Sequence, residues 1–261
     1  MLKVNQMKKK LASGGSVFGT WSMFSSPSVM NVIGTSGLDF AIIDMEHGPT
    51  SFETAENQIY ATESAGCTPI IRLGDGSDQN ILRALEVGTQ AIMVTHVATV
   101  EEAQRIVEAA KYPPEGSRGL SPFTRAHGYS DENLQQKLRA ANEQMFVGVL
   151  IEGEDGMRNL PKIAKVKGLD LIYLGLYDLS QAMGFAGQLE HPSLLKILKE
   201  FVQVIEDAGV AAGSVARDKA YLKILCESGF RFLAYRVDCA ILREGFETAR
   251  QWYDEITEKK G

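Results

Sequence analysis

The segment FAIIDMEHGP, residues 40–49, is the part of the sequence that indicates the fold most clearly. Its apolar first half is typical of a buried strand, which leads directly into Asp44, Glu46 and His47 before a Gly-Pro pair ends it. Parallel sheets carry their reactive side chains in the loops that follow buried strands. The segment therefore predicts a buried parallel strand with a functional site at its carboxyl end.

Similar apolar runs recur on both sides of this segment, and a helical pattern follows each one. The predicted strands span residues 17–23, 40–45, 69–73, 91–96, 145–151, 169–174, 210–215 and 230–237. The predicted helices span residues 2–12, 28–36, 52–65, 79–86, 100–111, 132–143, 159–166, 192–208, 219–227 and 241–259. Eight strand-then-helix units predict the α/β class and a closed (β/α)₈ TIM barrel, preceded by an N-terminal helix, as a single domain over residues 1–261.

A doubly wound open sheet is the alternative for a chain of this length. Such a sheet usually carries a glycine-rich nucleotide-binding turn after its first strand, and the sequence FGTWSMFSSP at 18–27 has no GxGxxG pattern. The alternation breaks once, over residues 112–130, which are rich in Pro, Gly and Ser. A loop of this length inside a compact domain is usually functional or mobile.

The composition argues against several classes of function. The formal net charge is −6, and a nucleic-acid-binding surface needs clustered Lys and Arg, so no nucleic acid is expected as a partner. No apolar stretch is long enough to predict a membrane span, and the N-terminus lacks the apolar core of a signal peptide. The three cysteines form no CxxC pair, which argues against a disulfide framework and a zinc site. A reduced, cytoplasmic setting fits these features best.

Four further polar residues lie at the ends of predicted strands or just after them: Arg72, His96, Glu152 and Asp178. In a parallel barrel the active site lies at the carboxyl ends of the strands, so these side chains are expected to converge on one cavity with those of the opening segment. Glu152 and Asp178 are the candidate metal ligands, because carboxylate oxygens suit a hard ion such as Mg²⁺ or Mn²⁺. The alternative is that these acids only cap the helices that follow.

Arg72 and His47 are the candidates for chemistry. Arg72 fits a clamp for a substrate carboxylate or a stabiliser of a developing enolate oxygen, and its alternative is a structural buried salt bridge. His47 fits a general base, because its ordinary pKa lies near working pH and Asp44 or Glu46 could orient its ring. The lysines fall in predicted helices, at helix ends or in the C-terminal tail, which disfavours a Schiff-base mechanism.

Together these residues and their neighbours resemble the HpcH/HpaI aldolase family over nearly the whole chain. The shared motifs are GLDFAIIDMEHGP at 37–49, PIIRL at 69–73, ALEVGTQAIMV at 84–94, YPPEGSRG at 112–119, IEGEDGMRNL at 151–160 and LGLYDLSQAMG at 174–184. Members of this family are metal-dependent pyruvate aldolases that cleave 4-hydroxy-2-oxo acids or 2-keto-3-deoxy sugar acids. The resemblance implies a class II aldehyde-lyase that releases pyruvate and an aldehyde.

The resemblance also implies a role for each main candidate. His47, acting through a water molecule, is the base that removes the 4-hydroxyl proton. Arg72 binds the pyruvate group and stabilises its enolate. Glu152 and Asp178 hold the divalent metal, Mg²⁺ or Mn²⁺ or else Co²⁺ or Zn²⁺, on which the pyruvate enolate forms.

Other positions carry secondary roles or depart from the family pattern. Glu86 stands where the family has an acid that makes the histidine more basic, and Tyr177 where a backbone amide contacts pyruvate. Leu150 replaces a glutamine that some members use toward substrate, and Leu176 and Thr95 replace prolines. These departures reshape the pocket wall and leave the aldehyde half of the substrate open.

Relatives of this kind are homo-hexamers, dimers of trimers in which C-terminal helices exchange between subunits. The predicted helix 241–259, with Phe246 and Trp252 on it, is compatible with such an exchange. The alternative is an ordinary outer helix of the barrel.

Two other functions stay open beside the aldolase. The first is a lyase for a CoA thioester, of the citramalyl-CoA or malyl-CoA type. The absence of a basic nucleotide-binding run favours the free acid over the thioester. The second is a non-catalytic barrel that binds 2-oxo acids.

Overall fold

The computed structural model, which describes residues 3–258, is a closed barrel of eight parallel strands. The strands are β1 (Val17–Ser22), β2 (Phe40–Asp44), β3 (Thr68–Leu73), β4 (Ala91–Val94), β5 (Phe146–Ile151), β6 (Leu171–Leu174), β7 (Ala211–Ala216) and β8 (Phe232–Val237). Each strand pairs with the next along the chain, and β8 pairs with β1 to close the ring. The predicted (β/α)₈ barrel is confirmed, and the open sheet is excluded.

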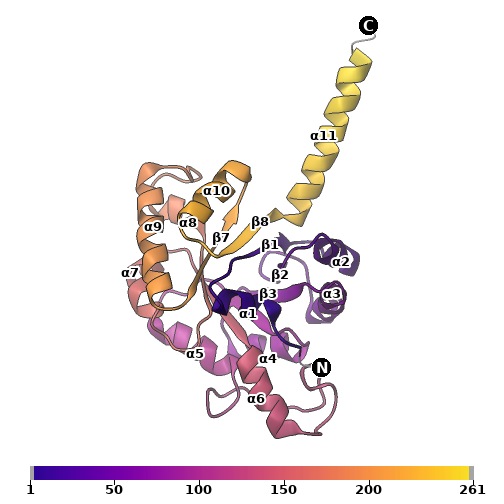
Figure 1. Cartoon of the computed structure of the whole chain (residues 1–261), viewed down its shortest axis with the longest axis vertical. Coiled ribbons are helices and arrows are strands. Elements are labelled where there is room, and N and C mark those ends of the chain that lie inside the picture. Colours follow the sequence, from indigo (N-terminus) through magenta and orange to yellow (C-terminus); the bar gives the residue numbers. More distant parts are fainter. Residues whose placement is uncertain (1–2, 259–261) are drawn as a thin grey trace.

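Helices connect the strands and cover the outside of the barrel (Figure 1). They are α1 (Gln6–Ala12), α2 (Pro27–Thr35), α3 (Phe52–Ser64), α4 (Asp78–Glu86), α5 (Val100–Ala110), α6 (Leu134–Gln144), α7 (Glu154–Ile163), α8 (Leu176–Ala182), α9 (Pro192–Asp207), α10 (Lys219–Glu227) and α11 (Asp238–Glu258). Several begin behind a Ser or Thr whose hydroxyl accepts a backbone N–H of the first turn, as Ser51 does for α3 and Thr99 for α5.

Three helices differ most from the prediction. The helix α1 begins at Gln6, four residues after the predicted start at 2, because the side chain of Asn5 accepts the backbone N–H of Lys8 and caps the helix there. The helix α7 begins at Glu154, five residues before the predicted start at 159, because acidic side chains suit the positive end of a helix. The helix α8 follows β6 directly and is absent from the prediction, since seven residues are too few to show a helical period. Residue 2 of the first predicted helix and Lys259 of the last lie outside the described residues.

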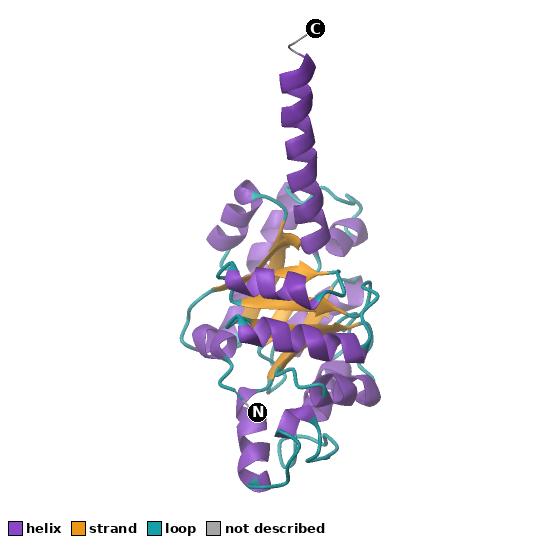
Figure 2. Ribbon diagram, turned by 90° about the vertical axis from the view of Figure 1, so that its right-hand side faces the viewer, coloured by secondary structure: helices purple, strands orange, loops and turns teal. Residues whose placement is uncertain are grey.

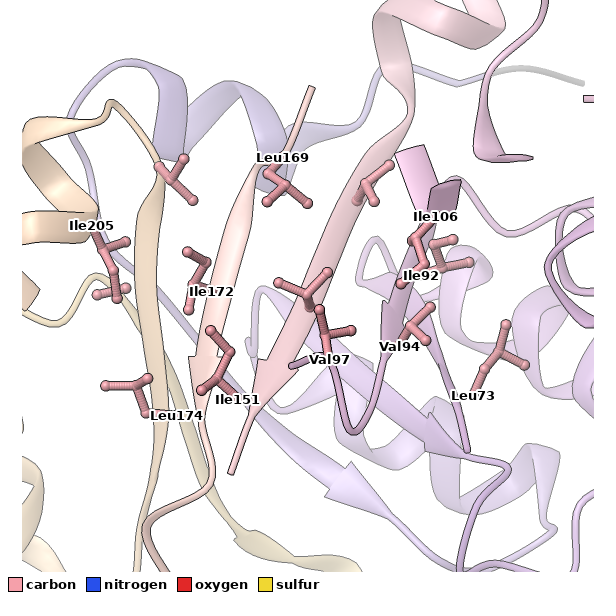
Figure 3. Packing of buried hydrophobic residues seen from close by; sticks show 14 of the residues in the cluster. Leu73, Ile92, Val94, Val97, Ile106, Ile151, Leu169, Ile172, Leu174 and Ile205 are labelled. Carbon is pink, nitrogen blue, oxygen red and sulfur yellow. The ribbon is translucent and has the colours of Figure 1, made fainter. Parts of the chain in front are cut away.

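Buried side chains form two layers. Inside the barrel, aromatic rings fill the axis, and the rings of Phe40 and Phe232 stack with their centroids 4.1 Å apart. Outside the barrel, aliphatic side chains of the strands pack against the helices (Figure 3), as Ile92 and Ile172 do near Ile106 of α5 and Ile205 of α9. The strands are therefore buried on both faces, which explains their nearly continuous apolar runs.

The helix α1 covers the amino end of the barrel. Its Lys8 forms an ion pair with Asp170, with 3.0 Å between Nζ and Oδ1, and also donates to the carbonyl oxygen of Met145. The other carboxylate oxygen of Asp170 accepts the backbone N–H of Val147 at 2.9 Å. With this end covered, the carboxyl ends of the strands are the open end of the barrel.

The C-terminal helix α11 behaves differently from the other helices. It leaves the barrel after β8 and projects away from it, as two perpendicular views show (Figures 1 and 2). Several large apolar side chains on it are exposed, among them Phe246 at 68% and Trp252 at 61%. None of the helices within residues 3–258 is long and apolar enough to span a membrane.

Candidate active site

A buried ion pair joins the ends of β2 and β3. The register of the two strands places Asp44 beside Arg72, and both side chains are at most one-tenth exposed. The Nε atom of Arg72 donates to Oδ1 of Asp44 at 2.9 Å, and its Nη2 contacts Oδ2, so the pair is bidentate. The guanidinium lies 4.6 Å from the ring centroid of Trp21 on β1. Arg72 is thus held in one orientation at the open end of the barrel.

A second carboxylate extends this pair toward β5. Oε2 of Glu46 lies 2.8 Å from Nη1 of Arg72, and Oε1 lies 2.8 Å from Nε2 of His96. The other ring nitrogen of His96 lies 2.5 Å from Oε1 of Glu152. His96 adopts a left-handed backbone conformation with φ of 58°, which is uncommon for a residue with a side chain. A line of alternating acidic and basic side chains therefore runs from Asp44 to Glu152.

Glu152 is the most perturbed acid of this site. Burial raises the pKa of its carboxyl group, the nearby charges of Asp178 and Glu46 raise it further, and His96 opposes them. The approach of His96 to Oε1 lacks hydrogen-bond geometry, so this buried oxygen has no hydrogen-bond partner among residues 3–258. Gly175 leaves room beside it, because a Cβ there would lie 3.0 Å from Cβ of Glu152. A partly buried carboxylate that two neighbouring acids repel, with one oxygen lacking a hydrogen bond, fits the binding of a cation.

The donor set suits a hard ion that keeps open positions. Within the described chain, no three side chains of His, Cys, Asp and Glu are placed to hold one metal. Glu152 and Asp178 would supply two carboxylate ligands, and water or substrate oxygens would supply the others. This matches the way proteins bind Mg²⁺ and Mn²⁺, through one or two carboxylates and exogenous oxygens.

His47 lies at the same end of the barrel but stands apart from this charged line. Its side chain is exposed, and its backbone N–H donates to Oδ1 of Asp44 at 3.1 Å. The expectation that Asp44 or Glu46 orients its ring is not met, because both carboxylates are turned to Arg72. No hydrogen bond of the imidazole is found within residues 3–258. The ring is therefore free to reach a water molecule or a substrate.

Within one chain the structure does not bring Glu86 to His47. Glu86 ends α4, which runs back from the carboxyl end of β3 to the amino end of β4, so it lies at the opposite end of the barrel. There its Oε1 pairs with Nη2 of the buried Arg118 at 2.9 Å.

Tyr177 and Leu150 take different places in the structure. Tyr177, on α8, is half exposed and lines a cavity of about 600 Å³ together with Asp44 and Arg72. Leu150 is buried in the barrel interior, in register with Tyr173 on β6. The hydroxyl of Tyr173 accepts a hydrogen bond from Trp21 Nε1 at 3.0 Å, which closes the floor under Arg72.

Arg217 and Arg236 are not among the site residues predicted from the sequence, and the prediction gives His96 no specific role. Arg217 follows β7 and Arg236 lies near the end of β8, and both line the same cavity. The rule that selected Arg72, a polar residue at a strand end, would have selected them as well. The pairing of His96 with both glutamates has no signal in the sequence, because it depends on a backbone turn with positive φ.

Comparisons with known proteins identify the family of the chain. The family model described as HpcH/HpaI aldolase/citrate lyase matches residues 17–244. The chain is 34% identical over 251 residues to a hydroxypyruvate/pyruvate aldolase of Roseobacter denitrificans, covering 95% of this chain and 97% of the relative. It is 34% identical over 244 residues to a 4-hydroxy-2-oxo-heptane-1,7-dioate aldolase of Shigella flexneri, covering 93% and 91%.

Solved structures show the same fold. An HpcH/HpaI aldolase/citrate lyase family protein from Burkholderia cenocepacia superposes with a TM-score of 0.90 at 27% identity, covering 96% of this chain and 99% of that one. The protein CitE of Mycobacterium tuberculosis, solved with magnesium and acetate, is more distant. It has a TM-score of 0.55 and 13% identity and covers 87% of each chain, a likeness of fold alone.

Proposed function

Because the chain belongs to the HpcH/HpaI aldolase/citrate lyase family, and is accordingly a carbon–carbon lyase, we propose that it cleaves a 4-hydroxy-2-oxo acid to pyruvate and an aldehyde with the help of a divalent metal. One observation carries this proposal. The oriented guanidinium of Arg72 and the unsatisfied carboxylate of Glu152 lie at the same end of the barrel, joined through Glu46 and His96. Such an end can bind the carboxylate group and the keto oxygen of a 2-oxo acid.

The side chains of this chain have separate roles in the proposed reaction. His47, through a water molecule, accepts the proton of the 4-hydroxyl group. The C3–C4 bond then breaks, its electron pair forms the pyruvate enolate, and the aldehyde leaves. Arg72 donates to the enolate oxygen, and Asp44 keeps the guanidinium in place. Protonation of C3 completes pyruvate.

Glu152 and Asp178 would hold the metal. A divalent ion supplies Lewis-acid attraction for the carboxylate and keto oxygens of the substrate when it is bound. The choice among Mg²⁺, Mn²⁺, Co²⁺ and Zn²⁺ is left to measurement. The backbone amide of Tyr177 and the side chain of Leu150 are proposed to contact the substrate, since Tyr177 lines the cavity and Leu150 lies beside Gly175. A role for Glu86 beside His47 would require a neighbouring protomer.

Pyruvate release tests the activity. The protein is incubated with each divalent ion and a panel of 4-hydroxy-2-oxo acids, and pyruvate is followed with lactate dehydrogenase and NADH. We expect release that needs the metal and that falls by about a hundredfold or more in His47→Ala and Arg72→Gln. Metal-independent release, or none across the panel, would refute the proposal.

Metal binding tests the ligands without any turnover. Calorimetric titration with Mn²⁺ should show a clear loss of affinity in Glu152→Gln and in Asp178→Asn. Asp155→Asn is the matched control, because Asp155 is an exposed acid paired only with Arg158 on the surface of α7. Wild-type affinity in both test variants would remove these residues from the ligand set.

A second candidate is a lyase of the citrate-lyase type that acts on a CoA thioester, because the family description covers such enzymes. An assay with citramalyl-CoA or malyl-CoA separates the two, since only the free-acid aldolase should ignore the thioester. Thermal stabilisation by pyruvate or oxalate with metal, without turnover of any substrate, would instead indicate the third possibility, a binding protein.

We also propose a cytoplasmic homo-hexamer built as a dimer of trimers. The projecting helix α11 supports assembly, because its exposed apolar side chains have no cover within residues 3–258. The cytoplasmic setting is supported by the cysteines, which the structure shows as free thiols at 67, 226 and 239.

A further inference from the structure

The cavity at the open end of the barrel has two chemically different sides. One side carries Arg72 of β3 beside Asp44 of β2, and both belong to the proposed site for the 2-oxo acid. The other carries Arg217 and Arg236, set among Val215, Ala216, Val237 and Cys239. At about 600 Å³, the cavity falls in the range that holds whole small-molecule ligands. A substrate held at Arg72 can therefore extend toward the second pair of arginines.

The backbone around Arg236 is irregular, and the irregularity sets the direction of its side chain. Gly19 of β1 is paired with Ala234 of β8, whereas Trp21 is paired with Val237, so two residues of β8 oppose one residue of β1. This is a β-bulge, a device that turns a side chain to a new direction near active sites. Arg236 has a φ of 46°, a left-handed conformation that favours glycine. An arginine at a position where glycine fits better points to a function of its side chain in the cavity.

Hydrogen bonds fix the two arginines to each other and to the rim. Nε of Arg236 donates to the carbonyl oxygen of Arg217 at 2.5 Å. Arg217 pairs with Glu190 and, at 3.1 Å, with Asp218, while Nη1 of Arg236 pairs with Glu244 at 2.7 Å. The three acids are roughly half exposed, so these pairs are weak and can be exchanged for a ligand.

Both guanidinium groups keep donors for a ligand. Each has five N–H donors, and within residues 3–258 no hydrogen bond engages Nη1 of Arg217 or Nη2 of Arg236. Asp44 is the one carboxylate among the described residues that line the cavity, and Arg72 already neutralises it. The three acids that pair with these arginines are not among the residues that line the cavity, so the wall itself presents the unengaged N–H donors of Arg217 and Arg236.

We propose that Arg217 and Arg236 bind an anionic group, a carboxylate or a phosphate, at the far end of the aldehyde half of the substrate. This inference rests on the proposed aldolase function and names its specificity. In the condensation direction, C3 of pyruvate loses a proton and bonds to the aldehyde carbon, whose oxygen gains a proton, so the step needs no further reagent. The two arginines contact neither C3 nor the aldehyde carbon and act by placing the acceptor.

Three aldehydes of different charge test the proposal in that direction with pyruvate and Mn²⁺. Butanal is neutral, succinic semialdehyde has the same chain length with a carboxylate, and glyceraldehyde 3-phosphate carries a phosphate. We expect the wild-type kcat/KM for at least one anionic aldehyde to exceed that for butanal by about tenfold or more. In Arg217→Gln and in Arg236→Gly this preference should be largely lost, through a rise of about tenfold or more in KM for the anionic aldehyde, with kcat/KM for butanal unchanged.

The choice of variants and a second assay distinguish loss of the fold, absence of the anion site and absence of the aldolase function. Glycine suits the backbone of residue 236, so Arg236→Gly should keep the fold, and Arg243→Gln removes one exposed arginine outside the cavity as a control. Exchange of the C3 protons of pyruvate in D₂O, followed by NMR without aldehyde, reports enolate formation alone. If the exchange is normal, an anion preference that is unchanged in both variants would overturn the anion site. A wild type that shows normal exchange but no anion preference would overturn it as well. Absence of exchange and of condensation in the wild type would overturn the aldolase function, and the anion site with it.

Discussion

The orientation of Arg72 depends on a carboxylate that is almost completely buried. Asp44 is 2% exposed and also accepts the backbone N–H groups of Glu46 and His47. Replacing it with asparagine leaves a buried guanidinium that only Glu46 still neutralises. We expect Asp44→Asn to lower the free energy of unfolding by about 2–4 kcal/mol. Urea denaturation measures the change, and Asp155→Asn, which breaks only an exposed pair, should stay within about 1 kcal/mol of the wild type.

Glu86 allows a test between a structural and a catalytic role. Its partner Arg118 has a side chain that is 3% exposed, so Glu86→Ala would strand a buried charge and should cost about 3–5 kcal/mol of unfolding free energy. Glu86→Gln keeps an acceptor and should cost less. If Glu86 instead raises the basicity of His47 in an assembled protein, Glu86→Gln should shift the pH profile of kcat/KM. An unshifted profile with lowered stability would leave only the structural role.

At the scale of single residues, the sequence predicts a functional side chain where a polar residue ends a buried apolar run. Asp44 and Arg72 can be found because each ends a buried apolar run, and parallel pairing brings those ends together. The line from Glu46 through His96 to Glu152 cannot be found in this way. It depends on the left-handed turn at His96 and on side-chain rotamers, which a residue pattern does not encode.

At the scale of elements, the eight strands are predicted well because burial on both faces makes each an uninterrupted apolar run. Their ends are less certain, as β4 ends at Val94 and not at His96. The chain has already turned at His96, and this turn directs the imidazole to the glutamates. The short helix α8, which carries Asp178, escapes prediction for lack of length, so the location of one proposed metal ligand follows only from the structure.

The attachment of α1 to the barrel gives a prediction that depends on pH. Burial raises the pKa of Asp170, and Lys8 opposes this. The native state therefore binds the proton of this carboxyl group at a higher pH than the unfolded state does. This contribution to the free energy of unfolding is present at low pH and is lost as the pH rises through the native pKa.

Lys8→Met tests this attachment, because it removes the ion pair and leaves a buried carboxylate. We expect a loss of about 1–3 kcal/mol at neutral pH. The loss should shrink as the pH is lowered through the raised native pKa of Asp170, since protonated Asp170 no longer needs the partner. Asp170→Asn should be nearly insensitive to Lys8→Met in a double-mutant cycle. A loss that does not change with pH would show that the hydrogen bond from Lys8 to the carbonyl oxygen of Met145, and not the ion pair with Asp170, holds α1 in place.

At the scale of the whole molecule, the barrel can be predicted by counting, because eight parallel units close a sheet on itself. The direction of α11 cannot be predicted from the sequence. A helix that packs on its own barrel and a helix that leaves it both carry apolar side chains, and the sequence pattern is the same for the two. The structure shows the second arrangement, with Phe246, Trp252 and Ile256 all more than 60% exposed.

This arrangement predicts that assembly depends on α11. Exposed rings on a projecting helix are stabilised when a second copy covers them, since burial of apolar area favours association. We expect the wild type to elute as a hexamer in size-exclusion chromatography with light scattering, and Phe246→Glu combined with Trp252→Glu to give a smaller species. Arg243→Gln, on the same helix, should keep the wild-type mass. A wild-type monomer would refute the assembly, and a double variant that remains hexameric would place the interface away from these rings.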